Sequence, residues 1–129
     1  MDEAIELAKR SIMESKHGCV IVHGRNGIVA SGINEHLHNQ EDRSIYSIHA
    51  EMNALCQLLR IKSHNERYMR DCVALVARVG PLSTGHAVRM SRPCEKCEKQ
   101  LRKMGIRKVY YTFDQNHIGE LVLHNKNNL

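Results

Sequence analysis

The run of residues 72–79, CVALVARV, is the feature that most constrains the fold of this chain. Only Arg78 interrupts its apolar side chains. A strand with one face in water alternates apolar and polar residues, whereas a continuous apolar run is typical of a strand buried on both faces. Gly80-Pro81 directly after the run is turn chemistry. The run therefore predicts the central strand of a sheet that helices cover.

Neighbouring segments predict what surrounds this strand. Asn26-Gly27 lies between two β-branched runs, a pattern typical of a hairpin turn. Apolar residues at helical spacing predict two helices, and Pro93 and Gly105 predict the start and end of a third. The expected helices cover residues 3–15, 48–60 and 93–105; the expected strands cover 19–22, 28–33, 72–79, 108–113 and 121–123; and residues 34–46, 62–70 and 81–92 are expected to form loops or surface connections.

This order of elements predicts an α/β fold in which five strands form one mixed sheet, with residues 1–129 as a single domain. The direction of the last two strands follows from the length of their connection. Only residues 114–120 separate them, and a parallel crossover needs about a dozen residues or more. We therefore expect these two strands to pair antiparallel.

Composition limits the class of protein. The five cysteines are an odd number, and two of them form a Cys-x-x-Cys pair, which favours metal ligation in a reducing compartment over a disulfide framework. The chain opens without a basic or apolar leader pattern, and no apolar run approaches membrane-spanning length. These features predict a soluble cytoplasmic protein without a membrane partner. The net charge of +5 is modest and spread along the chain, so it fits a generic surface better than a phosphate-bearing partner.

Three residues form a candidate metal site. Cys94 and Cys97 are spaced i and i+3 on the expected third helix, so they share a face and lie in the first turn, where the helix dipole favours thiolate. His49 lies at the start of the second helix, which should pack on the same sheet. A Cys-x-x-Cys pair alone fits a redox pair or half of a structural zinc site equally well. Beside His49, zinc ligation becomes the better hypothesis.

The number of ligands separates structural from catalytic zinc, because structural zinc takes four protein ligands and catalytic zinc keeps one position open. Cys56 lies two helical turns beyond His49, too far to share one ion. His86 is the credible fourth ligand for a structural site. Three ligands are the stronger hypothesis, because Glu51, two residues after His49, is then placed to reach a water on the metal.

Two motifs in the sequence, His49-Ala50-Glu51 and Pro93-Cys94-x-x-Cys97, resemble those of the cytidine and deoxycytidylate deaminase superfamily. Residues 32–34, GIN, and residues 104–111, MGIRKVYY, extend the similarity. The resemblance implies a three-layer α/β/α fold and one Zn2+ held by His49, Cys94 and Cys97. It also implies Glu51 as the proton shuttle, Asn34 and Ala50 as substrate contacts, and self-association into a homo-oligomer.

The function that the resemblance implies is hydrolytic deamination of a cytosine nucleoside or nucleotide to the uracil form, with release of ammonia. Two alternatives stay open: a deaminase of cytosine or adenine within single-stranded DNA or RNA, and a non-catalytic zinc-stabilised binding module. The use of histidine as the first zinc ligand in the sequence resembles the deoxycytidylate, transfer-RNA adenosine and guanine deaminases. The short connection between the last two expected strands instead resembles the cytidine and blasticidin deaminases. Arg89 and Arg92 are candidate phosphate contacts, and Tyr46 is a candidate stacking residue; surface or core positions fit them equally well.

Overall fold

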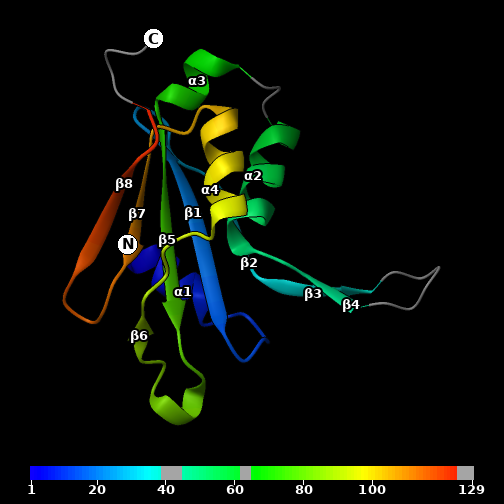
Figure 1. Cartoon of the computed structure of the whole chain (residues 1–129), viewed down its shortest axis with the longest axis vertical. Helices are drawn as coiled ribbons and strands as arrows, with labels where there is room; N and C mark the ends of the chain where they lie inside the picture. The colour runs from blue at the N-terminus through cyan, green and yellow to red at the C-terminus, as the bar shows by residue number, and fades with distance from the viewer. Residues whose placement is uncertain (39–44, 62–64, 125–129) are drawn as a thin grey trace.

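The computed structural model describes residues 1–38, 45–61 and 65–124. A sheet with the strand order β2-β1-β5-β7-β8 forms its centre (Figure 1). The continuous apolar run is β5, in the middle of that order, as predicted. The described part of the chain places six strands in this sheet, one more than predicted, because the short β6 (Val88–Arg89) also pairs with β5. The other five are β1 (Lys16–His23), β2 (Gly27–Ile33), β5 (Cys72–Val79), β7 (Lys108–Thr112) and β8 (Ile118–Val122).

The sheet is mixed, as the order of elements predicted. β1 pairs antiparallel with both β2 and β5, and β5 pairs parallel with β7. β7 and β8 pair antiparallel, with Lys108 opposite Val122. This confirms the prediction from the short final connection.

Helices cover both faces of the sheet, which gives three layers (Figure 1). The helices are α1 (Asp2–Ala8), α2 (Ala50–Ile61), α3 (Glu66–Arg70) and α4 (Glu95–Met104). Alternate residues of β1 point to opposite faces. Val20 packs with Ala4 of α1, whereas Cys19 and Ile21 pack in the cluster that includes α2 and α4. Within the described residues, no helix is both long enough and apolar enough to span a membrane.

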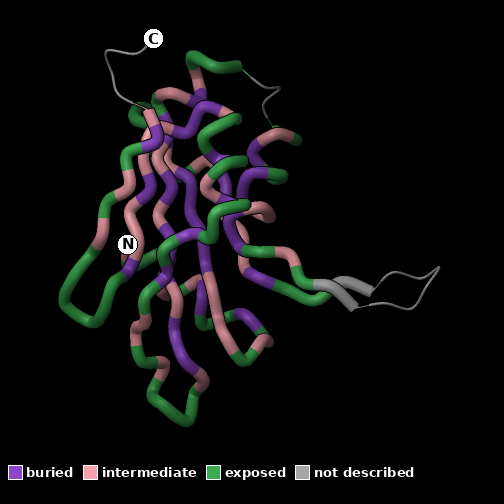
Figure 2. The backbone as a smooth tube through the Cα atoms, viewed as in Figure 1, coloured by how far each residue is buried: buried purple, intermediate pink, exposed green. Residues whose placement is uncertain are grey.

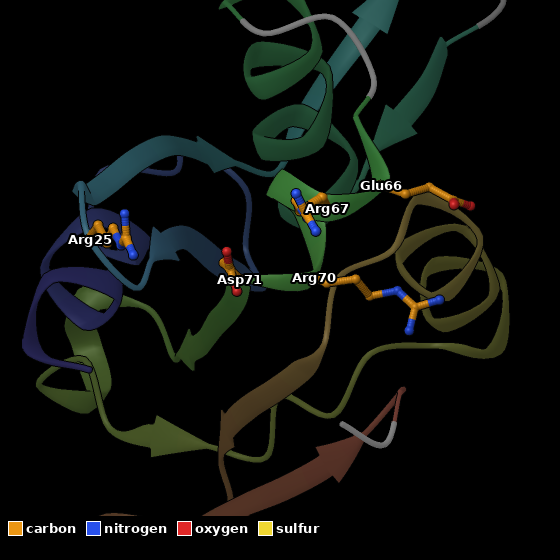
Figure 3. Close-up of a pocket in the computed structure, with 5 residues that line it drawn as sticks. All are labelled: Arg25, Glu66, Arg67, Arg70 and Asp71. Carbon is orange, nitrogen blue, oxygen red and sulfur yellow. The ribbon is translucent and has the colours of Figure 1, made fainter. Parts of the chain in front are cut away.

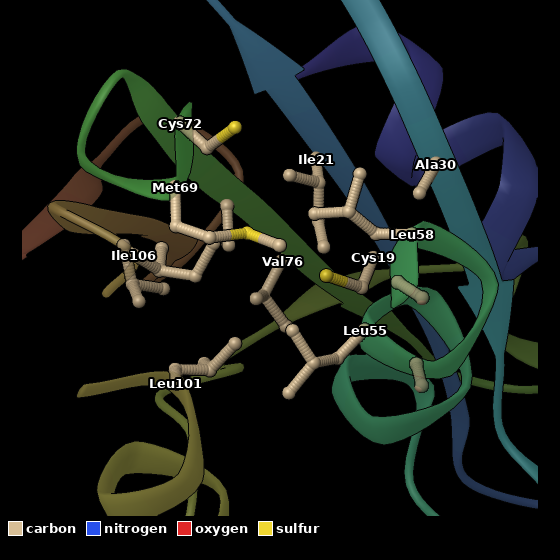
Figure 4. Packing of buried hydrophobic residues seen from close by; sticks show 14 of the residues in the cluster. Cys19, Ile21, Ala30, Leu55, Leu58, Met69, Cys72, Val76, Leu101 and Ile106 are labelled. Carbon is tan, nitrogen blue, oxygen red and sulfur yellow. The ribbon is translucent and has the colours of Figure 1, made fainter. Parts of the chain in front are cut away.

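The core between the sheet and α2/α4 is aliphatic and sulfur-rich (Figure 4). Its fully buried side chains include Ile21, Leu58, Met69 and Leu101. Buried stretches run through the strands and the inner sides of the helices, while the loops are exposed (Figure 2). Burial of these side chains supplies the main driving force for folding, at about 25 cal/mol per Å² of apolar surface.

The first helix is shorter than predicted, because it ends at Ala8 rather than at residue 15. Ser11 explains the difference. Its hydroxyl donates to the carbonyl of Asn34 and accepts from the N–H of Met13, and the side chain is buried. Serine competes in this way with the helical backbone pattern. The contact with Asn34 directs the chain from α1 towards the end of β2.

Two segments expected to be irregular contain regular structure. Residues 34–46 include β3 (Glu35–His38), which pairs antiparallel with β4 (Ile45–Ile48); residues 39–44 lie outside the described part. Residues 62–70 include α3, whose first turn is capped by Asn65 Oδ1 accepting from the N–H of Tyr68; residues 62–64 are not described. Short polar elements of this kind carry no clear hydrophobic period, so periodicity does not reveal them.

The segment of residues 81–92, predicted to be a loop, contains the 3-10 helix η1 (Leu82–Thr84) and the short strand β6 (Val88–Arg89), which pairs with β5.

The starts of two helices also differ from the predictions. α2 begins at Ala50 rather than at residue 48, and α4 begins at Glu95 with Cys94 as its N-cap, so Pro93 precedes the helix. Gly105 ends α4 at φ 100°, as predicted, because glycine adopts this left-handed conformation without strain.

Candidate metal and active site

His49 is held at the N-terminal end of α2. Its carbonyl accepts hydrogen bonds from the N–H groups of Met52 and Asn53, both at 3.1 Å. Asn53 Nδ2 donates to the carbonyl of Ile33 at 2.6 Å, which ties the first turn of α2 to the end of β2. The position of His49 is therefore fixed by the contact between α2 and β2.

That contact is close because Gly32 has no side chain. A Cβ at Gly32 would lie 2.5 Å from the backbone nitrogen of Ala54 and 2.8 Å from the carbonyl oxygen of Ala50. Atoms cannot approach so closely without displacement of the helix. Glycine at this position lets α2 lie directly on β2.

Cys94 and Cys97 are positioned by a buried polar network next to α4. Ser91 Oγ donates to the carbonyl of Val76 and accepts from the N–H of Thr112, both at 2.8 Å. The N–H of Ser91 donates to the carbonyl of Thr112 at 2.8 Å. These bonds join the segment before the cysteines to β5 and β7. No sequence motif pointed to Thr112, because its role depends on which strands become neighbours.

The predicted ligand atoms gather at one place. One ligand atom from each of His49, Cys94 and Cys97 lies within 4.8 Å of the others. His49 Nδ1 lies 3.2 Å from Cys97 Sγ and 3.6 Å from Cys94 Sγ. Tetrahedral zinc with the usual bond lengths puts an imidazole nitrogen and a thiolate sulfur about 3.5 Å apart. The three side chains therefore fit zinc in both donor chemistry and spacing.

The environment of Cys97 also favours a cation. Its thiol is buried, and burial together with the nearby Glu51 carboxylate raises its pKa well above the usual range. A thiolate at this position needs a positive charge, and a coordinating metal deprotonates a thiol outright. Cys94 was predicted to lie in the first turn of the helix, but it is the N-cap of α4 and is exposed.

His86 does not belong to the metal cluster, so the geometry does not support it as a fourth ligand. Among the described residues, the metal cluster found contains His49, Cys94 and Cys97 alone. His86 follows η1 in a left-handed backbone conformation. Its side chain is one of several that lower the pKa of Glu6 in α1. Cys56 is exposed and Cys72 is buried in the core, both outside the metal cluster. The three-ligand set leaves one tetrahedral position open.

Glu51 lies beside the metal cluster. It is 4% exposed, in the first turn of α2, and burial is the main cause that raises the pKa of its carboxyl group. The Cys97 thiol lies within hydrogen-bonding range of this carboxyl. A carboxyl group with a raised pKa next to a metal site can exchange protons near neutral pH.

A cavity of about 270 Å³ opens onto the metal cluster. Asn34 lines it, whereas Ala50 is fully buried and is not among its lining residues. Apart from Arg92, sequence motifs did not point to the polar side chains on its other walls, because these come from segments far apart in the chain. Among the described residues, the lining is Met13, Ser15, His17, Asn34, Ser47, His49, Glu51, Ser91, Arg92 and Cys94.

The two arginines near the zinc motif differ in position. Arg92 lines the cavity and lies 3.9 Å from Glu98. Arg89 instead places its guanidinium against Gly80, away from the cavity lining. The side chain of Tyr46 lies outside the described residues.

A larger hollow, of about 710 Å³, lies beside α3 and the β1–β2 turn (Figure 3). Arg25, Glu66, Arg67, Arg70 and Asp71 line it. Its charges are mixed, and it contains none of the three clustered ligands. Size alone therefore does not identify the functional site, and we assign it to the smaller cavity by its chemistry.

Fold and site together define a zinc-binding α/β domain with a mixed sheet. Residues 1–113 match the family described as the cytidine and deoxycytidylate deaminase zinc-binding region, and the chain belongs to this family. Zinc is thus the metal that the family and the His-Cys-Cys cluster indicate. No curated protein matches the chain.

One solved structure supports the fold. A mutant cytidine deaminase from Mycobacterium tuberculosis is similar over 99% of this chain and 94% of its own, with a TM-score of 0.55 and 17% identity. Two crystal forms of RibD from Acinetobacter baumannii match with 24% identity and TM-scores of 0.48 and 0.49, over 87% of this chain. The chain spans 26% of the RibD chains.

Proposed function

We propose that this protein is a zinc-dependent hydrolytic deaminase that converts a cytosine nucleoside or nucleotide to its uracil form and releases ammonia. One observation carries the proposal. His49 Nδ1 and the two cysteine sulfurs lie together, and the buried Glu51 carboxyl faces the same cavity. Three ligands, an open position and an adjacent acid–base group are the parts that this reaction needs.

Zinc, when bound by His49, Cys94 and Cys97, would supply a Lewis acid that makes water a nucleophile near neutral pH. The protein's part is to hold the ligands and to move protons. Glu51 takes a proton from the attacking water and passes it to the ring nitrogen N3. Glu51 then takes the second proton from the hydroxyl that now lies on C4 and supplies it to the leaving amine. The carbon–nitrogen bond at C4 breaks, the C4 hydroxyl becomes the carbonyl of the uracil form, and ammonia departs.

The cavity walls would hold the base during this transfer. We propose Asn34 and Ala50 as substrate contacts. Asn34 lines the cavity, which supports a role in the binding wall. Ala50 is buried at the start of α2, so only its backbone would be suited to such a contact.

The test is a panel of substrates given to the zinc-loaded protein. We expect ammonia release from cytidine, deoxycytidine or deoxycytidine monophosphate, with uracil products confirmed by mass spectrometry. Guanine and short single-stranded DNA and RNA belong in the same panel. Absence of ammonia from every cytosine compound, with zinc bound, would contradict the proposal.

A base within single-stranded DNA or RNA is the second candidate substrate. The exposure of His49 and Cys94 favours it, because an open site can admit a base that remains attached to a strand. Arg92 at the cavity and the net charge of +5 suit a phosphate backbone. Deamination of oligonucleotides but not of free nucleosides or nucleotides would establish this alternative.

We also propose that residues 1–129 form one domain, that the protein self-associates and that it is cytoplasmic. The packing of helices on both faces of one sheet supports a single domain. Five free cysteines in the described part of the chain suit a reducing compartment. Self-association is proposed from the likeness to the deaminase family.

A further inference from the structure

Asn34 is a proposed substrate contact, yet its side chain is engaged with the protein itself. Its Oδ1 accepts from the N–H of His17 at 2.9 Å, and its Nδ2 donates to the carbonyl of Ser15 at 2.6 Å. Asn34 is also buried. Its amide therefore holds residues 15–17 in the cavity wall.

Ser15 and His17 are the side chains that this arrangement brings to the cavity, beside His49 and Glu51. His17 Nε2 lies 3.2 Å from Ser15 Oγ. Arg78 Nε donates to the same Ser15 oxygen at 2.9 Å, because Arg78 lies opposite His17 in the pairing of β1 with β5. One edge of the imidazole is therefore fixed by Ser15 and Arg78.

The other ring nitrogen of His17, Nδ1, has no hydrogen-bond partner in the described part of the chain. This nitrogen is not completely buried, and His17 is one of the residues that line the cavity. Burial is the main cause that lowers the pKa of His17 to about 4, and the positive charge of Arg78 adds to it. The ring is thus neutral at physiological pH, with one donor and one acceptor nitrogen.

One arrangement of the hydrogen bonds in this network makes Nδ1 the donor. Ser15 Oγ accepts from Arg78, and its own hydrogen can then be donated to His17 Nε2. The ring proton of a neutral imidazole lies in that case on Nδ1.

No Phe, Tyr or Trp is among the described residues that line the cavity, so the imidazoles of His17 and His49 are the aromatic rings there.

We propose that His17 is a base-recognition residue of this site, whose Nδ1–H donates a hydrogen bond to an acceptor on the edge of the pyrimidine ring. Ser15, Arg78 and Asn34 hold the imidazole in the orientation for this contact. The inference rests on the proposed function, because it assumes that a cytosine base occupies the cavity. It adds the residue that selects for an acceptor atom on that base.

Two substitutions separate base recognition from a merely structural role. The amide nitrogen of Asn is bonded to Cγ, as Nδ1 is, so His17→Asn keeps a donor facing the base and loses the contact with Ser15. The longer side chain of His17→Gln keeps a group that can reach Ser15 and loses the donor at Nδ1. His117→Gln, on the exposed β7–β8 turn, is the matched control.

The experiment measures kcat and KM of each zinc-loaded variant with the best substrate of the panel. Calorimetry then gives the Kd of the same compound in the Glu51→Gln background, where the compound should stay unreacted. We expect His17→Gln to raise KM and Kd about tenfold or more, and His17→Asn to raise them clearly less. Zinc content and Tm should match wild type, and His117→Gln should have no effect.

An unchanged Kd in His17→Gln, or a larger loss in His17→Asn than in His17→Gln, would overturn the assignment of His17 and leave the proposed function standing. A zinc-loaded wild-type protein that neither binds nor converts any cytosine compound would overturn both. Activity of the wild type therefore distinguishes the two failures.

Discussion

His49 and Cys94 are 45 residues apart in the chain, yet their ligand atoms lie 3.6 Å apart. They meet because α2 and α4 run side by side on one face of the sheet and begin near the same end (Figure 1). The helix starts set the position of these side chains, and Glu51 follows two residues after His49, in the first turn of α2. A metal site built at two helix starts is rigid, which favours a fixed coordination geometry.

The open coordination position gives the first prediction. His86→Ala should leave zinc bound at about one ion per chain, because His86 is outside the metal cluster. The measurement is the zinc content of the gel-filtered protein, determined by atomic emission. His49→Ala is the control that should lose the metal. Loss of zinc from His86→Ala would instead indicate four protein ligands and a structural site.

At the residue scale, the sequence motifs were enough to pick out the three side chains of the metal cluster and Glu51 beside them, because zinc chemistry restricts both residue type and spacing. They were not enough to find Ser15, His17 or Thr112. These residues line or support the cavity only through the pairing of β1 with β5 and of β5 with β7. No local pattern in the sequence records such pairings.

Among the elements, the contact of α2 with β2 controls the site most directly. Gly32→Ala should destabilise the protein by about 1–3 kcal/mol, because its Cβ would overlap the backbone of α2. The displaced helix should also bind zinc more weakly, since His49 lies at its start. Urea unfolding and competition with a chelator measure the two effects.

Gly24→Ala provides the matched control for that variant. Its Cβ would meet only the carbonyl oxygen of Asp71, at an ordinary contact distance of 3.7 Å. We expect its stability and zinc affinity to stay close to wild type. Equal behaviour of the two variants would show that the close contact between α2 and β2 does not govern the site.

Element types were predictable where burial leaves a clear pattern, as in the continuous apolar run of β5 and the helical spacing of apolar residues in α2. Element ends were less predictable, because they depend on contacts across the fold. α1 ends early through the bond from Ser11 to Asn34, and the β3–β4 hairpin lacks a strong hydrophobic alternation. Sheet direction was predictable from the last connection because chain length limits it physically.

At the scale of the whole molecule, the family likeness predicts self-association. Light scattering at micromolar concentration should give a mass that is a multiple of the 14.8 kDa chain. The measurement is best made on the zinc-loaded protein, since metal binding and folding are coupled. A mass of one chain at that concentration would contradict this prediction.

The central claim is that Glu51 moves the protons while His49, Cys94 and Cys97 hold the metal. Glu51→Gln tests it, because Gln has nearly the same size but cannot accept and return a proton. General acid–base catalysis contributes roughly 10²–10⁴ in rate, and here one residue serves both halves of the transfer. The helix start should lose only a dipole contact worth under about 1 kcal/mol.

The decisive measurement is zinc content and ammonia release on the same sample of Glu51→Gln, using the best substrate of the panel. We predict one zinc per chain, a fold indistinguishable from wild type and a rate lower by about 10⁴ or more. A variant that holds zinc and deaminates at close to the wild-type rate would contradict the account.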